Sequence, residues 1–185
     1  MSEKKRCKWS LGDPLYTDYH DKEWGTPLHD DRKLFELLIL EGFQAGLSWI
    51  TILRKRENFR IAFDNFEASK IAVYNKQKVN SLLKNTGIIR NKLKIEAAII
   101  NAKVFLSVQK DFGSFDNYIW QFVNHKPVKN QFKSIGEIPA KTQISDTMSK
   151  NLKKRGFRFV GSTICYAFMQ ATGMVNDHIK GCWKY

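Results

Sequence analysis

The most informative segment of the chain reads Leu152-Lys153-Lys154-Arg155-Gly156-Phe157-Arg158-Phe159-Val160-Gly161-Ser162-Thr163. It predicts a helix that ends at Gly156, a tight apolar turn, and a second helix that starts after Gly161. We expect Phe157, Phe159 and Val160 to anchor this turn in the core. Two helices joined in this way form a helix-hairpin-helix pattern, because the free amides at the start of the second helix can hold a phosphate.

Basic side chains surround the predicted hairpin and supply a positive field for a nucleic-acid backbone. Contacts of this kind hold a duplex of any sequence. The alternative is an ordinary corner between two helices with a solvated basic face. The candidate DNA-binding residues of this segment are Arg155, Gly156, Arg158, Gly161 and Ser162.

The composition favours one globular domain with a polyanionic partner. The chain has 185 residues, 43% of them hydrophobic, and a formal net charge of +13, so we expect a single domain over residues 1–185. Nucleic acid is the leading partner. An anionic membrane surface is the runner-up, but no basic amphipathic tail or lipidation signal supports it. Three cysteines do not suggest a disulfide framework, and the polar N-terminus contains no secretory signal, which favours a cytoplasmic protein.

Helix signals recur along the chain and strand signals do not, so the predicted class is all-α. Residues Asn124 to Ile144 read as a polar loop. The expected helices are Pro14 to about His20, Asp30 or Asp31 through Leu40, Trp49 to about Phe63, Lys76 to Asn85, Asn91 to about Lys110, a helix capped by Ser114 through Val123, one capped by Ser145 to about Lys154, and Ser162 to Thr172.

A second segment, from Leu40 to Trp49, has the features of a pocket wall. The carboxylate of Glu41 ends an apolar run, and glycines and an indole follow it. An acid in apolar surroundings is costly unless a cation or a donor faces it. The alternative is a helix that ends at Gly42 with Glu41 solvated at its rim. A membrane span is disfavoured because polar residues interrupt the apolar run.

Four residues near the two ends of the chain have the chemistry of a zinc site. Cys7 and His20 lie near the start, and His178 and Cys182 are four residues apart near the end. Two histidines and two cysteines make a complete tetrahedral set. The long gap between the pairs is not a zinc-finger spacing, so spacing alone leaves four unrelated residues as an open alternative. Cys165 lies among apolar residues and reads as core.

Short motifs along the whole chain resemble the bacterial DNA-3-methyladenine glycosylase I family. The resemblance runs from Cys7 to Cys182 with matching order and spacing, and no motif position departs from the pattern. It rests on Asp13-Pro-Leu-Tyr, Tyr19-His-Asp, Glu23-Trp-Gly, Ala45-Gly-Leu-Ser-Trp-Ile-Thr, Lys154-Arg-Gly-Phe and Val175-Asn-Asp-His.

The resemblance implies a helix-hairpin-helix DNA glycosylase fold with a structural Zn²⁺ that joins the N- and C-terminal segments. The implied ligands are Cys7, His20, His178 and Cys182. The implied base pocket uses Glu41 for base recognition, with Tyr19 and Trp49. Trp9, Tyr16 and Trp24 are further lining by position.

The same resemblance implies a base-excision repair enzyme that flips 3-methyladenine out of alkylated double-stranded DNA and hydrolyses its glycosidic bond. The turn that contains Gly46 and Leu47 is similar to a wedge that fills the gap left by the flipped nucleotide. Related enzymes that also cut the backbone carry a lysine where this chain has Ser162 and Thr163. We therefore expect no lyase activity, and a monomer without an obligate protein partner.

Two other classes of function compete with this one. A non-enzymatic helix-hairpin-helix DNA-binding module accounts for the charge and the hairpin but leaves Glu41 without a role. A zinc-dependent hydrolase needs an open metal position, which four protein ligands would close. Asp177, beside His178, has a structural or a catalytic role, and the residues alone do not separate the two.

Overall fold

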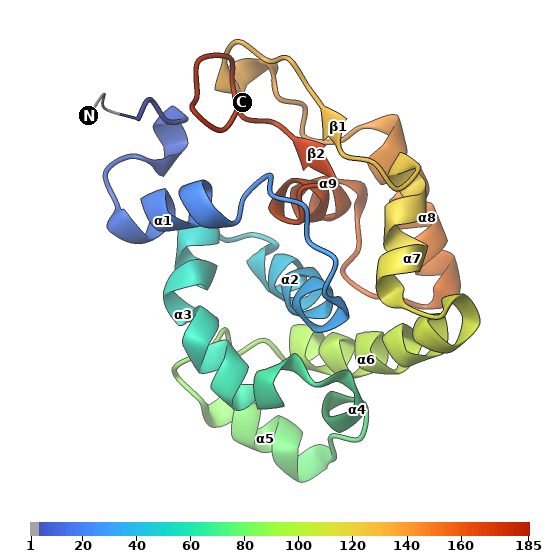
Figure 1. Cartoon of the computed structure of the whole chain (residues 1–185). Helices are drawn as coiled ribbons and strands as arrows, with labels where there is room; N and C mark the ends of the chain where they lie inside the picture. The colour runs from blue at the N-terminus through green and yellow to red at the C-terminus, as the bar shows by residue number, and fades with distance from the viewer. Residues whose placement is uncertain (1–3) are drawn as a thin grey trace.

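The computed structural model describes residues 4–185 as a predominantly helical chain (Figure 1). The α-helices are α1 (Pro14–Lys22), α2 (Asp31–Gln44), α3 (Trp49–Ala62), α4 (Ala68–Ile71), α5 (Lys76–Lys84), α6 (Lys92–Phe112), α7 (Phe115–Trp120), α8 (Gln143–Arg155) and α9 (Ser162–Ala171). Short 3₁₀ helices cover Lys8–Ser10, Asp64–Phe66, Gln121–Val123 and Ile135–Glu137. The all-α expectation is therefore confirmed in outline.

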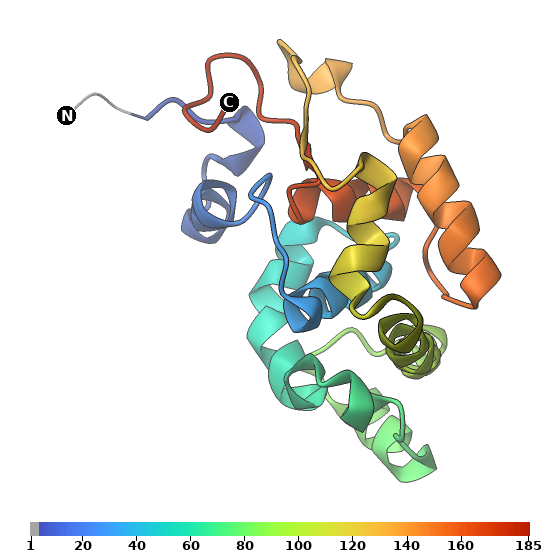
Figure 2. The same ribbon diagram turned by 45° about the vertical axis from the view of Figure 1, so that its right-hand side comes forward.

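Two helices form the centre of the molecule. Helices α2 and α9 pack against each other, and the remaining helices surround them in both views (Figures 1 and 2). Every residue of α2 from Leu34 to Phe43 is buried, including Glu36 and Glu41. A helix that is apolar all round must be covered on every side, and this burial places Glu41 deep inside the protein.

Side-chain caps begin most of the predicted helices. Asp13 accepts a hydrogen bond from the Leu15 amide, with Pro14 as the first helical residue, and Asp30 accepts one from the Lys33 amide. These caps confirm the predicted starts of α1 and α2. Ser48 is the N-cap of α3, but its hydroxyl pairs with the Thr51 hydroxyl at 2.7 Å and does not cap the backbone.

The start of α8 differs from the prediction. Thr142, rather than Ser145, is the N-cap, and Ser145 reaches back to the Thr142 amide at 2.8 Å. The two residues form a reciprocal capping box. Both are hydroxyl residues three positions apart, so either one satisfies the sequence pattern of a cap.

Helix α2 continues through Gly42 to Gln44, so Gly42 does not end it as the alternative reading required. A Cβ atom at Gly42 would lie 3.3 Å from the Cβ of Phe159 in the hairpin turn. Gly42 therefore allows the α8–α9 turn to approach α2 closely, which is a packing role rather than a terminating one.

Two very short strands were not expected from the sequence. β1 (Val128–Lys129) and β2 (Val175–Asn176) form a parallel pair in which Val128 lies opposite Val175. A strand of two residues is too short to show alternation. The pair fastens the segment after α7 to the segment after α9, directly before Asp177 and His178.

Within residues 4–185, no helix has the length and apolar content that crossing a membrane requires.

Candidate base-binding pocket and metal cluster

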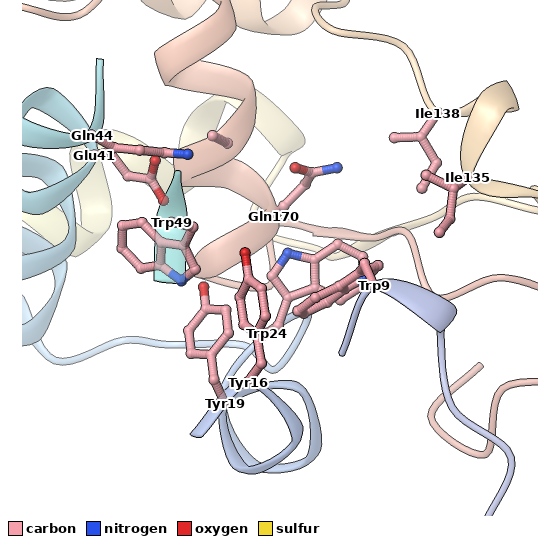
Figure 3. Close-up of a pocket in the computed structure, with 11 residues that line it drawn as sticks. Trp9, Tyr16, Tyr19, Trp24, Glu41, Gln44, Trp49, Ile135, Ile138 and Gln170 are labelled. Carbon is pink, nitrogen blue, oxygen red and sulfur yellow. The ribbon is translucent and has the colours of Figure 1, made fainter. Parts of the chain in front are cut away.

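A cavity of about 310 Å³ opens beside the C-terminal half of α2 (Figure 3). The sequence-predicted residues Trp9, Tyr16, Tyr19, Trp24, Glu41 and Trp49 all line it. They come from the N-terminal 3₁₀ helix, from α1 and the turn after it, from α2 and from the start of α3. The fold thus brings together the residues that the sequence singled out. Five further lining residues were missed: Gln44, Ile135, Ile138, Ala167 and Gln170.

Among residues 4–185, Glu41 is the only carboxylate that lines this cavity. Its side chain is 2% exposed, and within the described chain its Oε2 atom has no hydrogen-bond partner. Burial raises the pKa of Glu41 from 4.5 to about 8, because removal from water disfavours the charged form. A buried acceptor without a partner indicates a site built for a donor or a cation that enters from outside.

Aromatic rings form the other walls of the cavity. Trp9 lies edge-on to Tyr16, with ring centroids 5.1 Å apart, and edge-on to Trp24 at 5.0 Å. The ring centroids of Tyr19 and Trp49 are 5.6 Å apart, and Figure 3 shows the Glu41 carboxylate on the same side of the cavity as these two rings. Their π faces favour a planar ligand, more so a cationic one.

The five missed residues differ in how readily the sequence could have predicted them. Gln44 follows Glu41 by three positions on α2, so helical spacing places both on one face and could have predicted it. Ile135 and Ile138 come from the segment read as a polar loop, and Gln170 and Ala167 come from α9. Their positions depend on packing between distant segments, which no local pattern reports.

The four candidate metal ligands Cys7, His20, His178 and Cys182 converge in one buried cluster. The Cys182 Sγ atom lies 3.4 Å from His20 Nε2 and 3.5 Å from His178 Nδ1, and Cys7 Sγ lies 3.7 Å from His178 Nδ1. A tetrahedral Zn²⁺ with ordinary bond lengths separates its sulfur and nitrogen ligands by about 3.6 Å. The donor set therefore fits this ion.

The remaining ring nitrogens of the two histidines have partners. His20 Nδ1 contacts Asp21 Oδ1 at 2.8 Å, and His178 Nε2 contacts the Trp24 carbonyl oxygen at 3.0 Å. Such contacts orient metal-binding imidazoles. Burial lowers the pKa of His178 to about 4, so its ring is neutral at pH 7, the form that binds a metal.

This cluster directly adjoins the pocket wall. The rings of Trp24 and His178 are 4.7 Å apart and nearly perpendicular, and the Trp9 ring lies 5.4 Å from His20. The candidate metal ligands thus pack behind two of the indoles that line the cavity. A change in the cluster would be transmitted to the pocket through these ring contacts.

Asp177 lies outside the pocket and is 1% exposed. Its carboxylate accepts hydrogen bonds from Asn130 at 2.6 Å, Tyr166 at 2.7 Å and Gln170 at 2.8 Å. Three donors satisfy this carboxylate inside the protein. The arrangement favours the structural interpretation of Asp177 over a direct chemical one.

The turn between α8 and α9 has the predicted course but not all of the predicted contacts. Gly156 ends α8 in the left-handed conformation with φ of 103°, as expected for a helix C-terminus. Phe157 and Val160 are buried, whereas Phe159 is 37% exposed and has a positive φ of 54°. The expectation that Phe159 anchors the turn in the core is wrong: its side chain stays partly exposed, while its Cβ lies against Gly42 of α2.

Internal hydrogen bonds hold this turn rigidly. The Asn101 side chain accepts from the Arg158 amide at 2.7 Å and donates to the Arg158 carbonyl at 3.0 Å. Helix α9 starts at Ser162 after Gly161, without a side-chain cap. Its first amides therefore point outward, available to an anion.

The basic side chains of the hairpin differ in their surroundings. Arg155 pairs with Asp111 at 3.0 Å and lies over the Phe112 ring. Arg158 is exposed, and among residues 4–185 its guanidinium has no recorded ion pair. Arg158 is thus the freer of the two to meet a phosphate.

The turn after α2 is exposed and firmly held at its base. Leu47 is 41% exposed beside the exposed Gly46. Behind them the buried Lys94 donates hydrogen bonds from Nζ to the carbonyls of Phe43 at 2.8 Å and Ala45 at 2.7 Å. A cation here satisfies the last carbonyls of α2 and complements the helix dipole. No local sequence pattern predicts this role for Lys94.

The helical fold, the aromatic pocket and its buried acid are the features of a protein that binds a planar, cationic ligand. The family model for methyladenine glycosylase matches residues 9–185. DNA-3-methyladenine glycosylase 1 of Escherichia coli (strain K12) is 52% identical over 181 residues, covering 98% of this chain and 97% of that protein. The chain therefore belongs to the methyladenine glycosylase family.

Solved structures agree with this assignment. A crystal structure of 3-methyladenine DNA glycosylase I superimposes with a TM-score of 0.94 at 54% identity, covering 97% of this chain and 98% of the other. A tyrosine-to-phenylalanine variant of 3-methyladenine DNA glycosylase I, crystallised in complex with 3-methyladenine, has a TM-score of 0.94 at 36% identity, covering 97% and 96%.

Proposed function

We propose that this protein is a base-excision repair glycosylase that flips 3-methyladenine out of alkylated DNA and hydrolyses its glycosidic bond. The observation that carries the proposal is the unpartnered, buried carboxyl of Glu41 in an aromatic cavity. A base within a duplex cannot reach such a cavity, so it must leave the stack first.

The electrostatics of Glu41 favour a cationic base over a neutral one. In the empty pocket its pKa of about 8 keeps most of the carboxyl groups protonated at pH 7. N3-methylation leaves adenine cationic while it is attached to deoxyribose. A cation beside Glu41 stabilises the carboxylate. The negative charge of Glu41 and the positive charge of the base are therefore present in the pocket together. Neutral adenine provides no such compensation.

The damaged base itself supplies much of the chemical driving force. Its positive charge weakens the glycosidic bond and makes it a good leaving group. Glu41 then acts in base recognition by accepting hydrogen bonds from the adenine edge, and the aromatic walls contribute about 0.5–2 kcal/mol by stacking on the cationic ring. A strong protein nucleophile is unnecessary in this scheme.

Duplex binding is assigned to the α8–α9 segment as a helix-hairpin-helix motif. The outward amides at the start of α9, around Gly161 and Ser162, hold a phosphate, and Arg158 adds charge next to them. Gly156 and Arg155 shape and flank this surface. The exposed turn with Gly46 and Leu47 enters the gap left by the flipped nucleotide. Its fixed base at Lys94 supports this role, since a wedge must resist the stacked duplex.

The reaction is proposed to be simple hydrolysis. Ser162 and Thr163 occupy the first positions of α9, where related lyases carry a lysine. Without an amine at that place, a Schiff base with the sugar cannot form there. Incubation with abasic DNA and borohydride should therefore trap no covalent complex, and a trapped complex would contradict this assignment.

The metal cluster is proposed to hold a structural Zn²⁺ that joins the two ends of the chain. All four ligands are buried and supplied by the protein, so a water molecule has no open position as it would in a hydrolase. One domain over residues 1–185, a monomeric state, a cytoplasmic location and no obligate protein partner are proposed with it. The contiguous core of the described residues supports the single domain.

The test is release of free 3-methyladenine from methylated duplex DNA by the wild-type protein and by Glu41→Gln. We expect Glu41→Gln to weaken binding of the free base and to slow single-turnover excision by a similar factor. The contact with Glu41 forms only after the base has left the stack, so its loss raises the flipped state and the transition state equally relative to the unflipped complex. Duplex affinity should barely change.

Two outcomes would contradict parts of the proposal. Unchanged binding of the free base with collapsed excision would make Glu41 a chemical catalyst rather than a recognition residue. Duplex binding by the wild-type protein without any base release would favour the non-enzymatic DNA-binding module.

A further inference from the structure

The side-chain amide of Gln170 lines the pocket, and its orientation is set by a residue outside the cavity. Its Nε2 atom donates a hydrogen bond to Asp177 Oδ2 at 2.8 Å. A carboxylate oxygen that also accepts from Tyr166 has no hydrogen to give back. The NH₂ end of Gln170 must therefore face Asp177, and its Oε1 atom must face the opposite way.

The oxygen of Gln170 consequently faces the cavity as a fixed acceptor. In Figure 3 it lies on the side toward Glu41 and Gln44, with the nitrogen on the far side. Within residues 4–185 no donor is recorded for this oxygen. The backbone of Gln170 is also held, because its carbonyl accepts from the Gly25 amide at 2.9 Å.

Asp177 is itself anchored from three directions. Besides Gln170, it accepts from the Asn130 amide at 2.6 Å and the Tyr166 hydroxyl at 2.7 Å. Asn130 follows β1, and Asp177 follows β2, so the short strand pair keeps both in register. This network explains why a fully buried carboxylate lies behind the pocket without lining it.

We propose that Gln170 is a specificity-determining residue whose Oε1 accepts a hydrogen bond from an amino group of the bound base, and that Asp177 is the positioning residue that fixes this orientation. The inference rests on the proposed function. With Glu41 ionised beside a cationic base, the cavity presents acceptors on two walls. Such a cavity suits a purine with an exocyclic amino group and opposes one with an oxo group there.

The experiment titrates free 3-methyladenine and free 3-methylguanine against the wild-type protein and Gln170→Met, which keeps the length of the side chain and removes the acceptor. We expect the affinity for 3-methyladenine to fall about tenfold and that for 3-methylguanine to change much less. The ratio of the two affinities should therefore fall. A parallel loss for both bases, with the ratio unchanged, would overturn the proposal.

Asp177→Asn tests the positioning role separately. An asparagine can donate as well as accept, so the Gln170 amide can turn its NH₂ group into the cavity. We expect 3-methylguanine to gain affinity relative to 3-methyladenine, with some loss of thermal stability because asparagine cannot satisfy all three donors. An unchanged ratio in a folded, metal-loaded protein would remove Asp177 from the proposal, and if this variant does not fold, Gln170→Met still decides the role of Gln170.

Gln121→Met is the matched control, because this glutamine lies outside the cavity and donates to the Tyr118 carbonyl at 2.8 Å. Both affinities should be unaffected. Failure of the proposed function would appear differently, as a wild-type protein that binds neither base. Failure of this inference alone would leave wild-type binding of 3-methyladenine intact and its selectivity insensitive to Gln170.

Discussion

Replacement of Glu41 by glutamine should stabilise the empty protein, and increasingly so as the pH rises. The folded-state pKa of about 8 lies above the ordinary value of 4.5 because the carboxyl is desolvated. Between these two values the folded state binds more protons than the unfolded state, so the wild-type protein loses stability as the pH increases. Glutamine has no proton to lose and escapes this penalty.

The size of the effect follows from the same two pKa values. Each pH unit between them corresponds to about 1.4 kcal/mol, and the whole span to roughly 5 kcal/mol, an upper limit because water entering the cavity restores part of the solvation. For a chain of this length about 1 kcal/mol moves Tm by roughly 2–4 °C. The difference in Tm should therefore grow by several degrees per pH unit from pH 4.5 and level off above pH 8.

Thermal unfolding of both proteins from pH 4.5 to 9 without ligand provides the measurement. Titration of the histidines affects both proteins alike and cancels in the difference. Glu96→Gln is the control for the loss of one carboxylate, because the Glu96 side chain is partly exposed beside Lys92 rather than buried. A difference between wild type and Glu41→Gln that is equal at pH 5 and pH 8.5 would refute the reasoning about burial.

Three further substitutions test the other assignments. Cys182→Ser should lower the metal content and reduce Tm by roughly 8–16 °C, since a cross-link that closes so long a loop is worth about 4 kcal/mol. Elemental analysis measures the metal content, and wild-type protein without stoichiometric metal would contradict the zinc site. Arg158→Ala should weaken binding to all duplexes similarly and reduce the slope of log affinity against log salt concentration by about one. Arg155→Ala should change this slope less, because Asp111 already pairs with Arg155. A loss of affinity for some sequences only would count against backbone binding by Arg158. Lys94→Met should cost about 1–3 kcal/mol of folding stability and reduce the 2-aminopurine fluorescence signal of base flipping. Unaltered base flipping would exclude the proposed role of Lys94 in supporting the turn with Gly46 and Leu47.

Local sequence features predicted most helix starts correctly because their causes span only a few residues. The Asp13-Pro14 pair is one example. The Asp13 side chain accepts a hydrogen bond from the Leu15 amide, and Pro14 is the first residue of the helix. Gly42 is the opposite case. Its neighbours on α2 resemble a helix end, but the reason for the glycine is Phe159, which packs against it from a distant part of the chain.

Phe159 is a second position where the local sequence does not predict the packing. Three apolar residues in one turn all appear suited to the core, yet the turn can bury Phe157 and Val160 only by directing Phe159 outward.

The candidate site was predictable where the residue type itself carried the chemistry. Glu41 was conspicuous because an acid in an apolar run needs a reason, and the four metal ligands were conspicuous because cysteine and histidine are rare. Gln170 is chemically unremarkable in the sequence. Its role emerges only when α9 places it beside Asp177 and opens it to the cavity.

The metal cluster also has a consequence for the order of events during synthesis. Cys7 and His178 are 171 positions apart, and both belong to the proposed metal site. At about 5–20 residues per second, the ribosome produces the second pair of ligands roughly 10–30 s after the first. Throughout that interval Cys7 and His20 form half of a site, exposed to any competing metal or oxidant. Trp24 packs against His178, so this part of the pocket wall can adopt its final position only after His178 has left the ribosome.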